Sequence, residues 1–169
     1  MAQERTGVVT FRGNGVTLLG PELRLGDPAP DFELIGPDLK PVKLADSRGK
    51  TRLICAVPSL DTPVCAKETK RFNEAAAGLG EGVVVYAVSL DLPFAQKRFC
   101  GAEQTDKIVP LSDYKDHSFG LAYGVRIKEL GLLARSVFVV GPDDRIKYIE
   151  IVPEIAQEPD YDKALAAAR

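Results

Sequence analysis

The stretch PSLDTPVC at residues 58–65 follows an apolar run and predicts a helix with a cysteine in its first turn. Thr62 is a favoured N-cap residue type, and Pro63 suits the first helical position because its missing N–H would have no helical partner there. Cys65 then takes the third helical position, where unpaired backbone N–H groups and the helix dipole stabilise negative charge. This position favours the thiolate, which is the nucleophilic form of cysteine.

The residues on either side of this helix predict alternating strands and helices. Two β-type runs at 8–11 and 16–19 flank Gly13-Asn14-Gly15 and predict an N-terminal β-hairpin. Further strands are predicted at 32–35, 53–57, 83–90, 108–111, 136–140 and 146–152, and helices at 63–79, 92–100 (capped by Asp91), 118–123 and 161–168. This order predicts an α/β fold with a mixed sheet and helices on both faces. Cys65 would then follow the carboxyl end of a strand, where open α/β sheets usually bind ligands.

The composition is that of one globular domain over residues 1–169. Apolar residues make up 45% and charged residues 27% of the chain, and a domain of this length buries roughly 70% of its unfolded surface. The net charge of −2 predicts no basic surface for nucleic acid, and no stretch is long or apolar enough to span a membrane. The first residues lack the pattern of a secretory signal, so we expect a cytoplasmic protein.

Three cysteines, Cys55, Cys65 and Cys100, are too few for a secreted disulfide scaffold. In a reducing compartment a disulfide is more often catalytic or redox-sensing than structural. A metal site is not expected, because the cysteines lack C-x-x-C spacing and His117 is the only histidine. Cys55 lies in the apolar run 53–57 and is interpreted as a core residue. From the residues alone, Cys100 is as well explained as a partly exposed free thiol as by a second redox-active cysteine.

Two further interpretations have to be weighed. His117 and a neighbouring aspartate would allow a Cys–His hydrolase, but the stretch around His117 is polar and no oxyanion-binding motif accompanies it. A cation near the thiolate could come from Arg98, Arg126 or Arg135, and the residue types do not distinguish these three. Composition alone favours Arg135 as a solvated charge at the start of an apolar strand.

Longer matches relate the chain to a known family. The pattern P-x-x-x-T-x-x-C at 58–65 resembles that of the peroxiredoxins, thioredoxin-fold enzymes that reduce hydroperoxides with a cysteine. VTFRGN at 9–14, LPFAQKRFCGAE at 92–103, GLLARS at 131–136 and EPDY at 158–161 narrow the resemblance to the bacterial thiol peroxidases, of the atypical two-cysteine type. These segments cover the chain almost from end to end. The resemblance therefore implies a thioredoxin-like mixed sheet.

The resemblance also implies roles for five residues. Cys65 matches the peroxidatic cysteine and Cys100 the resolving one, so an intramolecular Cys65–Cys100 disulfide is expected. Pro58, Thr62 and Arg135 complete the active-site set. Thr62 would offer its hydroxyl to the thiolate and the peroxide, act as the helix cap, or do both. Arg135 would stabilise the thiolate and hold the peroxide through its fork of donors, while Pro58 would shield the sulfur from water.

By the same resemblance, the substrates are hydrogen peroxide and alkyl or lipid hydroperoxides. Thioredoxin is the expected reductant, with electrons that come ultimately from NADPH, and no cofactor or metal is expected because sulfur transfers the electrons. A homodimer that serves antioxidant defence is also expected. A thiol–disulfide oxidoreductase is disfavoured because C-x-x-C is absent. A redox sensor that uses the same cysteine pair is the remaining alternative, which continuous turnover would exclude.

A disulfide between two helical cysteines has a structural requirement. Bridged cysteines have Cα atoms within about 7 Å of each other, and Cys65 is predicted to begin one helix while Cys100 lies in another. We therefore expect a reduced form with the helix wound and an oxidised form in which its first turn unwinds.

Overall fold

The computed structural model describes residues 2–169, which form ten strands, four α-helices and one short 3-10 helix. In chain order these are β1 (Glu4–Phe11), β2 (Asn14–Leu19), β3 (Glu33–Ile35), β4 (Pro41–Lys43), η1 (Leu44–Ser47), β5 (Thr51–Ala56), α1 (Pro63–Ala76), β6 (Val83–Ser89), α2 (Pro93–Glu103), β7 (Val109–Ser112), α3 (Ser118–Ala122), β8 (Arg126–Ile127), β9 (Ser136–Val140), β10 (Ile146–Ile151) and α4 (Tyr161–Ala168). β9 and α4 have the predicted bounds. That residues 1–169 form one domain stays a prediction.

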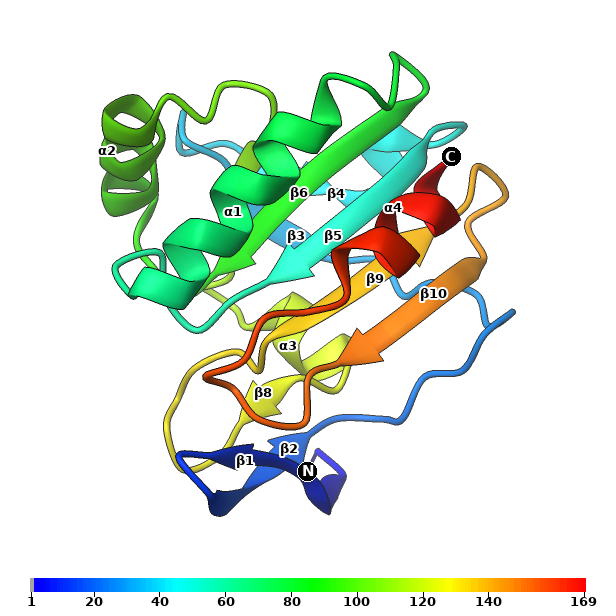
Figure 1. Ribbon diagram of the computed structural model, residues 1–169. Helices are drawn as coiled ribbons and strands as arrows, with labels where there is room; N and C mark the ends of the chain where they lie inside the picture. The colour runs from blue at the N-terminus through cyan, green and yellow to red at the C-terminus, as the bar shows by residue number, and fades with distance from the viewer. Residues whose placement is uncertain (1) are drawn as a thin grey trace.

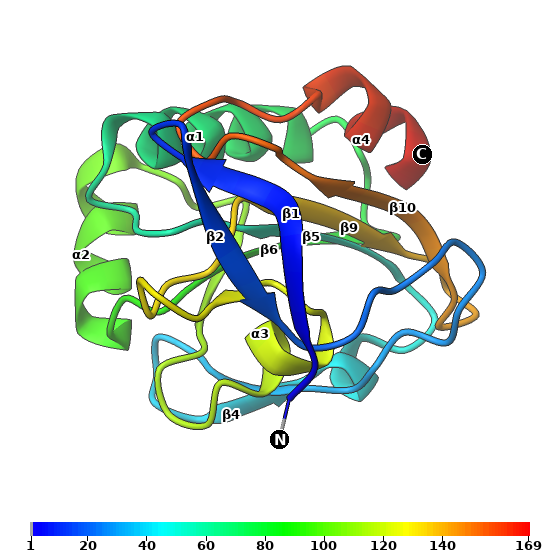
Figure 2. The same ribbon diagram turned by 90° about the horizontal axis from the view of Figure 1, so that it is seen from below.

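The main sheet has seven strands in the order β10-β9-β5-β6-β7-β3-β4. β5, β6 and β7 are parallel, and the remaining neighbours pair antiparallel. α1 and α4 cover one face of this sheet, and α3 lies on the other (Figure 1, Figure 2). The predicted mixed sheet with helices on both faces is confirmed.

β5 is the strand that leads into the cysteine-bearing helix, and all six of its residues are buried. Because side chains alternate along a strand, Leu53 and Cys55 pack in the apolar layer under α1 and α4. Ile54 and Ala56 pack in the layer that includes α3. A strand that is buried on both faces is rigid, so the loop between β5 and α1 leaves from a fixed point.

The N-terminal hairpin is present, but its turn differs from the prediction. Arg12 and Gly13 are the two turn residues, with φ of 52° and 82°, which is the left-handed backbone that tight hairpin turns require. Asn14 pairs with Phe11 and already belongs to β2. The turn therefore lies one residue earlier than Gly13-Asn14-Gly15 suggested. β1, β2 and the two-residue strand β8 form a small sheet of their own at one end of the molecule (Figure 1).

Other differences concern short elements and helix ends. β4, β8 and η1 were not predicted, because two to four residues are too few to show a hydrophobic period. α1 ends at Ala76, three residues before the predicted end. α2 has Leu92 as its N-cap and not Asp91, and the carboxylate of Asp91 bonds elsewhere, as described below.

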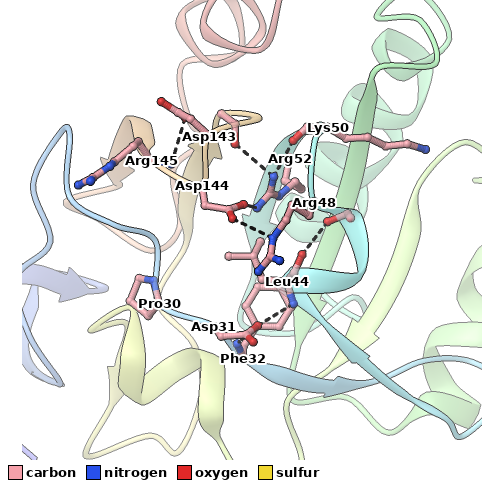
Figure 3. Close-up of polar contacts among 12 residues, drawn as sticks. Pro30, Asp31, Phe32, Leu44, Arg48, Lys50, Arg52, Asp143, Asp144 and Arg145 are labelled. Carbon is pink, nitrogen blue, oxygen red and sulfur yellow. Dashed lines mark hydrogen bonds and ion pairs between the residues drawn. The ribbon is translucent and has the colours of Figure 1, made fainter.

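Buried Arg52 holds the opposite end of β5 from the cysteine-bearing helix (Figure 3). Its side chain is 0% exposed and donates to the carbonyl groups of Lys50 at 2.7 Å and Gly141 at 3.1 Å. It also pairs with Asp144, whose second carboxylate oxygen lies 3.4 Å from Arg48. These bonds fix the turn between β9 and β10 against the start of β5.

Candidate active site

α1 begins where the sequence predicts, with Thr62 at the N-cap, Pro63 first in the helix and Cys65 third. The Thr62 carbonyl accepts a hydrogen bond from the Ala66 N–H at 2.9 Å. Its hydroxyl donates to the Ser59 carbonyl at 3.0 Å and makes no cap bond. The expected side-chain cap is therefore wrong, and the hydroxyl proton points into the preceding turn and not to sulfur. Thr62 itself is exposed at the mouth of the site.

The sulfur of Cys65 lies beside the guanidinium of Arg135. Cys65 is fully buried, and its Sγ accepts a hydrogen bond from Arg135 Nη2 at 3.2 Å. Arg135 stands immediately before β9, and its Nε donates to the Ile155 carbonyl at 2.8 Å. Its Nη1 lies 2.5 Å from Glu68 Oε2. The structure thus brings Arg135, one of three arginines that the residue types could not distinguish, to Cys65.

Glu68 is a buried acid that our sequence analysis did not single out. It is 0% exposed, and its Oε1 has no hydrogen-bond partner among the described residues. A signal was available, because Glu68 follows Cys65 by three positions and so lies on the same face of α1. Phe72 continues that buried face one turn later. An acid on the core side of a helix needs a cation, and Arg135 provides it.

Burial and charge oppose each other in this cluster. Burial raises the pKa of Glu68 from 4.5 to about 7, although Arg135 acts to lower it. Burial acts to lower the pKa of Arg135, but the charges and hydrogen bonds of Glu68 and Cys65 outweigh it and raise that pKa. Arg135 therefore stays cationic next to the sulfur. Its charge is shared between two acidic groups while Glu68 is ionised.

A pocket of about 290 Å³ is lined by Arg135, the residue that bonds the buried sulfur of Cys65. Pro58, Thr62 and Arg135 line it, so the structure brings together three of the five predicted site residues beside Cys65. The rest of its wall is largely apolar and comes from four parts of the chain: Phe11 and Arg12 of the hairpin, Ser59, Pro63 and Val64 around the start of α1, Leu132 before β9, and Ile155 and Ala156 after β10. Pro58 is buried and lines the pocket, and its expected shielding role stays a prediction.

Cys100 lies on α2, which runs beside α1 (Figure 1). Cys55, Cys65 and Cys100 are all free thiols in this structure. Cys100 is partly buried, and burial raises its pKa. Its neighbour Phe99 packs against the small apolar cluster that contains Cys65. α2 is thus adjacent to the helix that carries Cys65, but the two sulfurs are not bonded.

Asp91 connects the loop before α1 with the start of α2, and sequence analysis assigned it only a capping role. Its carboxylate accepts from the Ser59 hydroxyl at 2.7 Å, the Leu60 N–H at 2.8 Å and the Ser89 hydroxyl at 2.8 Å. Ser89 accepts in turn from buried Gln96 of α2 at 3.0 Å. A single carboxylate therefore holds both cysteine-bearing segments in place.

The structure also tests the interpretation of Cys55 as a core residue and of His117 as the partner of a catalytic cysteine. Cys55 is fully buried in the layer beneath α1, which confirms its interpretation as a core residue. Burial, followed by the charge of Glu68, raises its pKa well above the usual value. His117 is the N-cap residue of α3, and its Nδ1 accepts from Arg126 Nε at 3.2 Å. Its hydrogen bond is to Arg126 and not to a cysteine, so the structure gives no support to a Cys–His pair.

Two further observations concern metals and membranes. Within residues 2–169, no group of three or more His, Cys, Asp or Glu side chains is placed to hold a metal ion. None of the helices that these residues form combines the length and apolar character needed to cross a membrane.

Comparisons with known proteins place this fold and site in one family. The redoxin family matches residues 24–165 of the chain. The thiol peroxidase of Halalkalibacterium halodurans is 54% identical over 161 residues, which cover 95% of this chain and 96% of that protein. The thiol peroxidase of Bacillus subtilis is 52% identical with the same coverage. The chain therefore belongs to the redoxin family, among its bacterial thiol peroxidases.

Solved structures agree with this assignment. A peroxiredoxin-like protein from Aquifex aeolicus superposes with a TM-score of 0.90 at 44% identity, over 97% of this chain and 95% of that one. A thiol peroxidase from Chromobacterium violaceum has a TM-score of 0.82 over 92% and 91% of the two chains, and at 19% identity it shows the shared fold alone. Family membership makes the chain a thiol-dependent peroxidase of the peroxiredoxin type. It does not favour the redox-sensor alternative.

Proposed function

We propose that Cys65 is the peroxidatic cysteine and Cys100 the resolving cysteine of this peroxidase. The Cys65 thiolate attacks the terminal oxygen of a hydroperoxide, the O–O bond breaks, and the alcohol or water leaves after it takes up a proton. The resulting sulfenic acid then reacts with the Cys100 thiol. A Cys65–Cys100 disulfide forms, and one water molecule is released.

The observation that supports this assignment best is the bond from Arg135 Nη2 to Cys65 Sγ, since Arg135 also lines the pocket. An arginine presents several donors in one plane, so the guanidinium that binds sulfur also borders the space where a peroxide would lie. Thr62 lines the same pocket, and its hydroxyl can turn from the Ser59 carbonyl to a bound peroxide. Pro58 keeps bulk water away from the sulfur.

Ionisation of the Cys65 thiol can account for only a small part of the expected rate acceleration, so the main contribution is expected from Arg135. A thiol with a pKa of about 8.5 is already a few per cent ionised near neutral pH. Full ionisation therefore gains only about one to two orders of magnitude, and part of this is lost because nucleophilicity falls with pKa. Most of the acceleration must come from polarising the O–O bond and stabilising the departing oxygen. The buried, fixed guanidinium of Arg135 is suited to both.

Disulfide formation requires α1 and α2 to open locally. Cys65 is buried in the first turn of α1, and Cys100 lies 35 positions (100 − 65) further along the chain in α2. Unwinding the first turn of α1 breaks few hydrogen bonds because its N–H groups have no helical partners. The disulfide, once formed, closes a loop worth about 4 kcal/mol in the chain-entropy model. Opening also exposes Cys100, whose pKa is raised by burial.

The pocket supports organic hydroperoxides as well as hydrogen peroxide as substrates. A volume of about 290 Å³ is far larger than hydrogen peroxide needs, since one water molecule occupies roughly 30 Å³ in the liquid. Phe11, Val64, Leu132 and Ile155 provide apolar walls for an alkyl or lipid chain. A thioredoxin-type dithiol protein, charged by NADPH, is proposed as the reductant. A cofactor-free reaction, a homodimer and a cytoplasmic location complete the proposal.

Intact mass spectrometry after one equivalent of peroxide tests the two cysteine assignments. The parent should lose two protons, Cys100→Ser should gain one oxygen on Cys65, and Cys65→Ser should stay unmodified. An oxygen adduct on Cys55, or a modified Cys65→Ser protein, would refute them. A second assay supplies thioredoxin, its reductase and NADPH, and continuous NADPH consumption that depends on hydroperoxide is expected. NADPH consumption that stops after one turnover would contradict the proposal that thioredoxin is the reductant.

A further inference from the structure

Arg12 stands at the rim of the active-site pocket and has no role in the chemistry proposed above. It occupies the hairpin turn, and its guanidinium carbon lies 5.1 Å from the centre of the Phe11 ring, within the range of a cation–π contact. Both residues line the pocket. Arg12 forms no salt bridge within the described part of the chain, and its side chain is exposed. Its charge is therefore available to a ligand.

The hairpin tip that holds Arg12 is fixed to the rest of the site. Two backbone hydrogen bonds join Thr10 to the loop after β10. The Thr10 N–H donates to the Pro153 carbonyl at 2.7 Å, and the Ile155 N–H donates to the Thr10 carbonyl at 3.0 Å. Glu154 accepts from the Gly13 N–H at 2.9 Å and from the Thr10 hydroxyl at 3.1 Å. The same Ile155 supplies the carbonyl that positions Arg135. The rim and the floor of the pocket are thus parts of one connected structure.

The charged residues that line the pocket are all cationic. Its eleven lining residues include two arginines, Arg12 and Arg135, and no acidic residue. Glu154 is an acid that bonds the turn at Gly13, and three donors bind its carboxylate, from Thr10, Gly13 and Ala156. Between the two arginines the walls are mostly apolar. Such a site favours a molecule that has a hydroperoxide at one end, an apolar chain, and negative charge at the other end.

We propose that Arg12 forms a subsite for an anionic group, above all a carboxylate, on the chain of an organic hydroperoxide whose peroxide end reaches Cys65. The proposal rests on the function proposed above, and it names the class of substrate that the enzyme selects. A guanidinium binds a carboxylate through paired donors. Hydrogen peroxide and uncharged alkyl hydroperoxides cannot use this subsite.

The test compares hydroperoxides that differ only in charge. Cumene hydroperoxide is paired with its para-carboxylate, and the hydroperoxide of linoleic acid with that of its methyl ester, below micelle-forming concentrations. We measure kcat/KM for each in the parent, Arg12→Gln, Arg12→Lys and Arg71→Gln. Arg71 is a matched control, because it also lies over an aromatic ring, Tyr161, at 5.5 Å, but does not line this pocket.

The parent should prefer the charged member of at least one pair by about two- to fivefold, the range for an exposed ion pair. Arg12→Gln should lose this preference and keep its rate with the uncharged member. Arg12→Lys should retain part of the preference, Arg71→Gln all of it, and added salt should weaken it in the parent. An equal ratio in parent and Arg12→Gln would overturn the subsite, as would an equal loss with both members. Failure of every hydroperoxide to oxidise Cys65 in the parent would instead refute the proposed function.

Discussion

Cys65 Sγ accepts a hydrogen bond from Arg135 Nη2 at 3.2 Å, although the two residues are 70 positions apart in the chain. Both residues are buried. Two further hydrogen bonds, to Glu68 and to the Ile155 carbonyl, hold the Arg135 guanidinium in place. A guanidinium that is held in three directions cannot turn away when a substrate enters. This preorganisation is what an electrostatic contribution to catalysis requires.

Arg135→Lys is expected to slow peroxide reduction about 100-fold or more, the range seen when one preorganised donor is removed. Lysine keeps the charge but loses the planar fork that reaches both sulfur and peroxide. Rates are measured by rapid-mixing kinetics at a pH where the Cys65 thiol is ionised in both the parent and the variant. This removes any effect of the substitution on the thiolate fraction. Arg126→Lys is the control and should resemble the parent, because Arg126 bonds His117. Equal rates for Arg135→Lys and the parent would exclude the proposed role.

Glu68 should make the stability of the fold depend on pH. Its pKa is about 7 in the fold and 4.5 as its ordinary value, so the folded state holds the proton more tightly than the unfolded chain does. The free energy of unfolding should therefore fall as the pH rises from about 4.5 and level off above about 7, by up to about 3 kcal/mol. Urea unfolding at pH 5 and pH 8 measures this change. Glu68→Gln has no charge to bury and should lose most of the pH dependence; parallel curves for the two proteins would contradict the prediction.

Asp91→Ala should loosen the connection between the two cysteine-bearing segments. Loss of the shared acceptor leaves Ser59, Leu60 and Ser89 without their partner, at an expected cost of about 1–3 kcal/mol in the free energy of unfolding. The sulfenic acid should then convert to the disulfide faster, so less Cys65 is over-oxidised to sulfinic acid at high peroxide. Quenched-flow mass spectrometry follows both products. Asp106→Ala, at an exposed acid close to the end of α2, should match the parent; an unchanged partition in Asp91→Ala would show that opening does not depend on this network.

Cys55 should be unreactive in the native protein. It is fully buried, and burial raises its pKa well above the usual value, so neither access nor ionisation favours reaction. Iodoacetamide at neutral pH, followed by peptide mass spectrometry, should leave Cys55 unlabelled until urea is added. Cys55→Val should keep the peroxidase rate of the parent. Labelling of Cys55 at the rate of Cys100 in native conditions would contradict this.

Local sequence predicted most of the fold because the strong elements have their own signals. The Val-rich strand, the alanine-rich last helix and the Thr62-Pro63 helix start depend on patterns that extend over a few neighbouring residues. The misplaced features are those that a neighbour decides. The hairpin turn moved by one residue to Arg12–Gly13, and β8 exists because β2 provides a partner for it.

The sequence by itself determined that a cysteine stands at the third position of a helix after a buried strand, since caps, prolines and apolar runs act over short distances. It did not determine which arginine meets that cysteine, that Glu68 shares this arginine, or that Asp91 joins the two cysteine-bearing segments. These contacts join residues that lie 31 to 70 positions apart in the chain. Only the folded sheet brings such residues within bonding distance. The tertiary structure decided the charge environment of the sulfur, because electrostatic interactions and burial depend on position in space and not on order along the chain.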